Sequence, residues 1–260
     1  MGEEYGFDQS WEQEKQRLRY LEQWLDPGTF RHLKDLGLGA GSQCLEVGGG
    51  HGSVARGMAD RVGGNGRVLV TDIDTNLLTE LASDTVEVQT HDITTGPPEP
   101  EAFDIAHARM VVGWIREREK ALQHMIEALK PGGLLVIEEL DQISQISIQP
   151  SECYERVIAA SDAAMKMVGY DMQLGRRLPW VLHELGLEGV SAEGRVVYGS
   201  YEDSPGLGMY RLTLERMREP LKAVGSVTDE DIEETLRILF DPDFEKMPPT
   251  IVAAWGRKPA

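Results

Sequence analysis

Residues 43–53 read Gln-Cys-Leu-Glu-Val-Gly-Gly-Gly-His-Gly-Ser, and this stretch decides the fold. Its first half is a short apolar run that stops at glycines, which is typical of a buried strand. A pattern with helical spacing follows over residues 53–62. A strand, a glycine-rich turn and a helix in this order predict the start of a β-α-β unit, in which successive strands run parallel.

The same alternation continues along the chain. Further strand patterns lie at residues 67–71, 86–90, 103–107, 134–138, 189–200 and 250–257, with helical patterns between most of them. We therefore predict an α/β protein with a doubly wound, mostly parallel seven-stranded sheet. In such sheets ligands bind beyond the carboxyl ends of the strands, so the residues that directly follow strands are the first candidates for a site.

Helical patterns dominate both ends of the chain. Residues 11–25 predict a helix, and Asp26-Pro27, with Asp as N-cap and Pro in the first turn, predicts a second helix that ends at Gly37. A long helical region extends over residues 152–185. We expect a division into an N-terminal helical cap at residues 1–39, a core at residues 40–204 and 249–260, and a helical lid or insertion before the last strand at residues 205–248.

The chain is strongly acidic. Its 260 residues include 44 Asp and Glu against 26 Lys and Arg, for a formal net charge of −18. An acidic surface without a basic patch repels nucleic acid and anionic membranes, and no apolar stretch approaches the roughly 20 residues of a membrane span. Two cysteines, Cys44 and Cys153, suggest neither a disulfide framework nor a zinc site. We expect a cytoplasmic monomer or homodimer that binds no metal and acts on a small molecule.

The glycine turn has the spacing acid-x-Gly-x-Gly-x-Gly, formed by Glu46, Gly48, Gly50 and Gly52. Glycines let the backbone turn sharply and let a ligand approach closely, and the helix that follows offers free N–H groups. A dinucleotide pattern requires glycine at position 53, which is Ser53 in this chain. A carboxylate at Glu46 suits a ligand with an ammonium and a sulfonium group, and it would repel a pyrophosphate.

Two further acids follow strand ends. Asp72 ends the second strand, where a carboxylate can accept hydrogen bonds from both hydroxyls of a ribose. Asp92 follows the third strand, where it can accept from the amino group of adenine. Ile73 and Ile93 stand next to these acids and are available to pack on the two faces of the ring.

Taken in order, these motifs resemble the class I S-adenosylmethionine-dependent methyltransferases, of the bacterial small-molecule type found in secondary metabolism and quinone pathways. Residues 46–52, 67–78 and 92–93 resemble the first three motifs of that family, and residues 103–112 and 129–137 resemble the next two. The resemblance implies a Rossmann-like methyltransferase fold and S-adenosylmethionine as the cofactor.

The resemblance also implies roles for individual residues. The methionine part of the cofactor would be contacted by the glycine turn and would lie over the positions that match Ala108 and Arg109. The cofactor-binding residues implied in this way, together with those argued above, are Glu46, Gly48, Gly49, Gly50, Asp72, Ile73, Asp92, Ile93, Ala108 and Arg109. One departure is Gly113-Trp114, where quinone-pathway relatives carry a pair of histidines, and this argues against methylation of a quinone ring carbon.

The implied reaction is an in-line displacement that moves a methyl group to a small organic acceptor in an enclosed pocket. The acceptor atom (O, N or C) stays open. Glu138, Glu139 and Asp141 end the fifth strand, and Glu139 is the first candidate among them for a group that deprotonates or orients the acceptor. We interpret His107 as a buried structural histidine. Two alternatives remain: a cofactor-binding scaffold without methyl transfer, either cyclase-like or a sensor, and a nicotinamide-dependent oxidoreductase, against which Glu46 and Ser53 argue.

Overall fold

The structure is a computed structural model that describes residues 13–198 and 204–260. These residues form two compact units. The first, called the core unit below, comprises Leu25–Glu139, Gly175–Gly194 and Val252–Ala260. The second, called the helical unit, comprises the described residues up to Trp24, together with Leu140–Leu174 and Arg195–Ile251.

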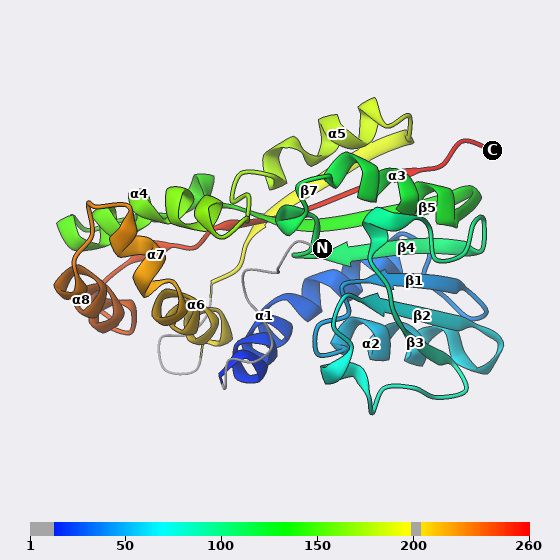
Figure 1. Cartoon of the computed structure of the whole chain (residues 1–260), viewed down its shortest axis with the longest axis horizontal. Coiled ribbons are helices and arrows are strands. Elements are labelled where there is room, and N and C mark those ends of the chain that lie inside the picture. Colours follow the sequence, from blue (N-terminus) through cyan, green and yellow to red (C-terminus); the bar gives the residue numbers. More distant parts are fainter. Residues whose placement is uncertain (1–12, 199–203) are drawn as a thin grey trace. The chain divides into compact units, whose positions relative to one another are not determined.

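A seven-stranded sheet lies at the centre of the core unit. Its strands are β1 (Gln43–Val47), β2 (Arg67–Asp72), β3 (Val86–Thr90), β4 (Phe103–Arg109), β5 (Leu129–Asp141), β7 (Glu188–Val196) and β9 (Thr250–Arg257). They are ordered β3-β2-β1-β4-β5-β9-β7, and Figure 1 shows β1, β2 and β4 side by side. The pairs β1–β2, β1–β4, β2–β3 and β4–β5 are parallel. The predicted seven-stranded, mostly parallel sheet is therefore confirmed.

Helices cover the two faces of this sheet because side chains alternate along each strand. On one face, Cys44, Ile105 and Val136 join a buried cluster with side chains of α1 (Glu14–Asp35) and α2 (Ser53–Val62). The helix α3 (Arg118–Ala128) packs against β4, and its buried apolar stripe includes Leu122 and Met125. This two-sided covering is the doubly wound arrangement that the sequence predicts.

The first helix differs from the prediction. We expected two helices separated at Asp26-Pro27, but α1 is one helix with Pro27 in its interior. The predicted start at residue 11 lies outside the described residues. An interior proline removes one backbone hydrogen bond and costs roughly 3 kcal/mol. The helix nevertheless continues, because Asp26 and Thr29, on either side of Pro27, make the polar contacts described below.

The helical unit is built around α4 (Glu152–Met167), which packs against α7 (Arg218–Ala223) and α8 (Asp229–Leu239). For this reason α4, which we expected in the core, groups with the segment 205–248 that we expected to form a separate lid. The predicted helical region 152–185 is also interrupted, since α4 ends at Met167 and the next α-helix, α5 (Leu178–Glu184), begins only at Leu178. The unit further contains α6 (Pro205–Arg216) and an antiparallel pair of short strands, β6 (Ile146–Ser147) and β8 (Lys246–Met247).

The remaining elements are α5 (Leu178–Glu184), which lies in the core unit, and short 3-10 turns at Gly63–Asn65, Asn76–Leu78, Ile93–Thr95, Val112–Trp114, Gln142–Ser144 and Gly175–Arg177. Among the helices of the described ranges, none combines the length and the apolar character that crossing a bilayer requires.

Candidate functional site

The glycine turn joins β1 to α2 in a conformation that only glycine adopts easily. Gly48 has φ of 74°, and a Cβ there would stand 2.1 Å from Val111 Cγ2, so a side chain is excluded. Gly50 has φ of 55°, but a Cβ there would meet nothing within 4 Å. The N–H groups of Gly48 and Gly49 donate to the carbonyl of Thr71 at 2.8 and 3.1 Å. The turn is thus held on the end of β2, and its Gly50 corner faces open space.

Asp72 ties this turn to the end of β2. Its Oδ2 accepts from the Gly50 N–H at 3.1 Å, and its Oδ1 accepts from the Asp74 N–H at 3.1 Å. Burial raises the pKa of Asp72, and these backbone donors oppose that shift. A carboxylate oxygen has room for more than one donor, so each oxygen can still accept from a ligand hydroxyl. Ile73 beside it is 53% exposed and offers an apolar surface at the same edge.

Asp92 begins the turn after β3. Its Oδ1 accepts from the N–H and the hydroxyl of Thr94 at 2.9 and 2.7 Å, so one carboxylate oxygen is already used to cap the turn. Ile93 is only 4% exposed, and its carbonyl accepts from His124 Nδ1 at 2.7 Å. The two isoleucines are therefore not equally available to a planar ring: Ile73 presents its side chain, whereas the Ile93 side chain packs in the interior.

A row of charged side chains lies on one face of the sheet beneath this edge. The register places Glu46 opposite His107, and Arg109 opposite Glu138. His107 and Arg109 are two residues apart on β4 and so point to the same face. All four side chains are buried, with exposed fractions between 0 and 9%. Buried charges persist only when they are paired and hydrogen-bonded, which makes their partners the next question.

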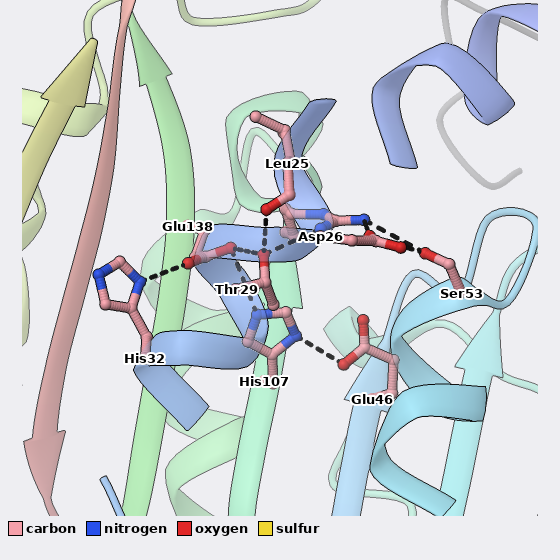
Figure 2. Close-up of polar contacts among 9 residues, drawn as sticks. Leu25, Asp26, Thr29, His32, Glu46, Ser53, His107 and Glu138 are labelled. Atoms are coloured by element: carbon pink, nitrogen blue, oxygen red, sulfur yellow. Dashed lines mark hydrogen bonds and ion pairs between the residues drawn. The ribbon is translucent and has the colours of Figure 1, made fainter. Parts of the chain in front are cut away.

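His107 lies between two carboxylates. Its Nδ1 is 2.6 Å from Glu46 Oε2, and its Nε2 is 3.9 Å from Glu138 Oε2, too long for a hydrogen bond but close for an ion pair (Figure 2). Burial acts to lower the pKa of His107, but the two carboxylates outweigh it and raise the pKa to about 9. Burial raises the pKa of Glu46, and His107 opposes that rise. The imidazole is therefore protonated at neutral pH.

Glu138 connects the sheet to α1. It accepts hydrogen bonds from the Thr29 hydroxyl and from His32 Nδ1, the latter at 2.9 Å (Figure 2). Burial acts to raise the pKa of Glu138, but the charge of His107, the hydrogen bond from His32 and the charge of Arg109 hold it well below its usual range. His32 Nε2 in turn lies 3.3 Å from Glu193 Oε1 on β7. The chain of contacts thus runs from beneath the glycine turn to the surface of the core unit.

Arg109 completes the link between α1 and α2. Its guanidinium donates to the Thr29 hydroxyl at 2.9 Å and to Asp26 Oδ1 at 2.9 Å. Ser53, the first residue of α2, donates to the same Asp26 oxygen at 3.0 Å (Figure 2). These contacts hold the part of α1 around Pro27 to β4 through Arg109 and to α2 through Ser53.

Three predicted site residues are buried. Ala108 is fully buried, and Arg109 is committed to Asp26 and Thr29, so neither presents a free side chain at the surface of the sheet edge. Glu139 is also fully buried, and its Oε1 accepts from the Gly113 N–H at 2.9 Å. One Glu139 oxygen thus holds the turn after β4, and its role as a group that orients or deprotonates the acceptor stays a prediction.

The sequence interpretation missed the network around His107 as a unit. The signal was present, since charged residues interrupt the otherwise apolar strands β1, β4 and β5 near their carboxyl ends. Within the described ranges, no cluster of three or more His, Cys, Asp or Glu side chains is arranged to hold a metal ion.

Comparison with known proteins adds to this geometry. The sequence model of a family described as a methyltransferase domain matches residues 13–192, more than half of the chain. The ubiquinone/menaquinone biosynthesis C-methyltransferase of Chromobacterium violaceum is 33% identical over 117 residues, which cover 43% of this chain and 48% of that protein. The chain spans about half the length of the curated relatives it matches.

Solved structures share the fold at low identity. Phosphoethanolamine N-methyltransferase 2 of Haemonchus contortus, in complex with phosphomonomethylethanolamine and S-adenosylhomocysteine, has a TM-score of 0.54 and 17% identity, covering 94% of this chain and 52% of that chain. The [4+2]-cyclase SpnF has a TM-score of 0.51 and 19% identity, covering 86% of this chain and 76% of that chain. At these identities the likeness concerns the fold alone.

Proposed function

The chain belongs to this methyltransferase domain family, and from that premise we propose that it transfers a methyl group from S-adenosylmethionine to a small organic acceptor. The observation that carries the proposal is the arrangement of the Gly50 corner and Asp72 at the carboxyl end of the sheet. Gly50 leaves open space beside the turn, and Asp72 keeps acceptor capacity on both oxygens. This is the edge at which parallel sheets bind their ligands.

The residues present fit that cofactor. The Gly48–Gly50 turn would lie against the methionine part, with Glu46 as the acid that matches an ammonium group, and Asp72 would accept from the ribose hydroxyls. Ile73 would cover one face of the adenine, and Asp92 has a second carboxylate oxygen for the amino group. Beneath the turn, the positions of Ala108 and Arg109 supply packing and the link to α1.

When bound, the cofactor supplies a methyl group on a sulfonium, which is already a good leaving group. The chain has to bind and orient the two reactants and exclude water, a contribution worth several orders of magnitude in rate. Glu139 is fully buried, and one of its oxygens already accepts from the Gly113 N–H. We therefore assign catalysis to alignment and leave a proton-accepting side chain unassigned.

The acceptor is proposed as a small organic molecule of specialised metabolism. The relative from Chromobacterium violaceum is a C-methyltransferase of quinone biosynthesis, but Gly113-Trp114 here replaces the histidine pair expected of quinone-pathway relatives. The net charge of −18 argues against nucleic acid as the substrate. Two free cysteines fit a reducing cytoplasm, and action as a monomer or homodimer stays a prediction.

A second candidate is a cofactor-binding scaffold that does not transfer methyl. Its support is the likeness in fold to a [4+2]-cyclase, which shows that this architecture also houses another reaction. The two candidates share the cofactor site and differ only in the product. Release of S-adenosylhomocysteine with an isotopically labelled methyl group in an acceptor identifies the methyltransferase.

The test is cofactor affinity in site variants. Asp72→Ala removes the proposed ribose acceptor, and Gly50→Val fills the open corner of the turn. We expect each to weaken binding of S-adenosylhomocysteine by about tenfold or more, since a hydrogen bond to a charged group is worth about 1.5–3 kcal/mol. Asp74→Ala is the matched control on the same loop. Unchanged affinity in both Asp72→Ala and Gly50→Val would refute the proposed site.

A further inference from the structure

Glu46 is the acid of the glycine-turn motif, yet its carboxylate is almost entirely buried, with the residue 2% exposed. One oxygen, Oε2, takes the 2.6 Å hydrogen bond from His107, and Figure 2 shows the other oxygen pointing away from that histidine. The residue therefore has one oxygen held by the protein and one that is not directed at His107. A carboxylate that is fixed on one side in this way is preorganised for a second cationic partner.

Burial works against this arrangement. A carboxyl group removed from water favours its neutral form, and burial raises the pKa of Glu46. A protonated Glu46 would have no charge to offer an ammonium group. Some nearby cation must therefore keep the carboxylate ionised before a ligand arrives.

His107 is the cation in hydrogen-bonding position. Arg109 is the other cation on this face, and its charge also acts to lower the pKa of Glu46, but its guanidinium donates to Thr29 and to Asp26 Oδ1, each at 2.9 Å. On its far side His107 faces Glu138, which also receives His32 from α1. The charged or titratable groups around the imidazole are thus Glu46 from β1, Arg109 on its own strand, Glu138 from β5, and Asp26 and His32 from α1. The carboxylates of Glu46 and Glu138 outweigh the effect of burial and keep the imidazole protonated, as its pKa of about 9 indicates.

We propose that His107 is a positioning residue for cofactor binding, which holds the Glu46 carboxylate charged and oriented toward the ammonium group of the cofactor's methionine part. This inference rests on the proposed function, because it assumes that the glycine turn binds that cofactor. Glu138 supports the same role one step further away, since its negative charge stabilises the imidazolium. From the sequence alone, we interpret His107 only as a buried structural histidine.

The experiment compares two ligands that differ only at the amino-acid end. S-adenosylhomocysteine carries the ammonium group, whereas 5′-methylthioadenosine keeps the adenosine and the sulfur but lacks the amino acid. His107→Gln keeps a donor of similar size and removes the positive charge. At pH 6.5 we expect this variant to bind S-adenosylhomocysteine about 10- to 100-fold more weakly, the worth of one charge-assisted hydrogen bond. Affinity for methylthioadenosine should stay within about twofold, because that ligand lacks the charged group.

The pH dependence separates this role from a structural one. In His107→Gln the Glu46 carboxyl keeps the rise in pKa that burial causes and loses the imidazolium that opposes it, so affinity for S-adenosylhomocysteine should increase with pH more steeply in the variant than in the wild type. In a Glu46→Gln background, adding His107→Gln should cause no further loss. His183→Gln, on α5 and outside the network, is the matched control.

Each outcome bears on one claim. Equal losses for both ligands in His107→Gln, or a loss that does not change with pH, would mean that His107 only stabilises the fold and would overturn the inference. If His107→Gln folds poorly, the single variant Glu46→Gln tests the contact from its other side. A loss of affinity specific to S-adenosylhomocysteine must then appear in Glu46→Gln, and equal losses for both ligands would overturn the inference. If wild-type protein binds neither ligand, the proposed function itself fails, which is a distinct result.

Discussion

Removal of the Glu138 charge is the perturbation whose effect follows most directly from the structure. Glu138 is fully buried, accepts from Thr29 and His32, and faces the protonated His107. Glu138→Gln keeps the shape of the side chain but leaves the imidazolium without one of its two carboxylates. Breaking a buried ion pair by removing one partner typically costs about 3–5 kcal/mol. For a chain of this size, that corresponds to a fall in Tm of about 6–20 °C.

The assay is urea unfolding followed by tryptophan fluorescence. Trp255 reports on this region because its ring lies 5.9 Å from the His32 ring. Glu87→Gln is the matched control, since Glu87 pairs with Arg67 at 2.7 Å at the surface, where such pairs are worth about 0–1 kcal/mol. A stabilising role for the Glu138 charge is excluded if the free energy of unfolding of Glu138→Gln lies within about 1 kcal/mol of wild type. The same conclusion follows if Glu87→Gln lowers the free energy of unfolding by as much as Glu138→Gln does.

The same network sets the sign of the pH dependence. The raised pKa of His107 contributes stability that is fully present below its ordinary value of 6.5 and is lost as the pH rises through about 9. The lowered pKa of Glu138 contributes stability that is present above its ordinary value of 4.5 and is lost as the pH falls through its folded value. Wild-type stability should therefore decline from pH 6.5 toward 9, and this decline should be smaller in Glu138→Gln. An equal decline in both proteins would show that His107 is not held by Glu138.

Three further predictions concern other positions. Gly48→Ala places a Cβ inside a neighbouring side chain and should lower the free energy of unfolding more than Gly50→Ala, which strains the backbone by only about 1–2 kcal/mol; equal losses in urea unfolding would contradict this. Burial raises the pKa of Cys44 to about 12, so a thiol reagent should label only Cys153 in the native protein and both thiols after unfolding. Labelling of both cysteines in the native protein would contradict this prediction. Thr228 caps α8, so Thr228→Ala should destabilise the protein by about 1 kcal/mol in the same assay, whereas Thr228→Ser should not.

Much of the core unit can be predicted from sequence because its signals are local. The run 43–47 ends at glycines, and the same alternation of strand and helix recurs up to residue 141, so the parallel sheet follows. Asp72 lies at the glycine turn because it ends the strand that pairs with β1. The spacing of the motif therefore fixes both the turn and its nearest acid.

The network beneath the turn could not be predicted in the same way. The contact of Glu46 with His107 depends on the order of strands in the sheet, which brings β1 beside β4, and on the register between them. Neither appears in a local pattern. Pro27 misled the prediction for a related reason: it is a helix breaker by its own chemistry, but the contacts of Asp26 and Thr29 with Arg109 hold the helix together around it. Long-range polar contacts outweighed a local preference.

The decisive measurement of the proposed cofactor site is calorimetric titration of the wild-type protein with S-adenosylhomocysteine, with NAD as the control. We expect saturable binding of one S-adenosylhomocysteine per chain, because Glu46 matches an ammonium group and Asp72 a ribose, and no binding of NAD, because Glu46 would repel its pyrophosphate. Binding of NAD would contradict the claim that the glycine turn and its acids form this cofactor site. A titration with S-adenosylhomocysteine that gives no heat of binding at any concentration would contradict it as well.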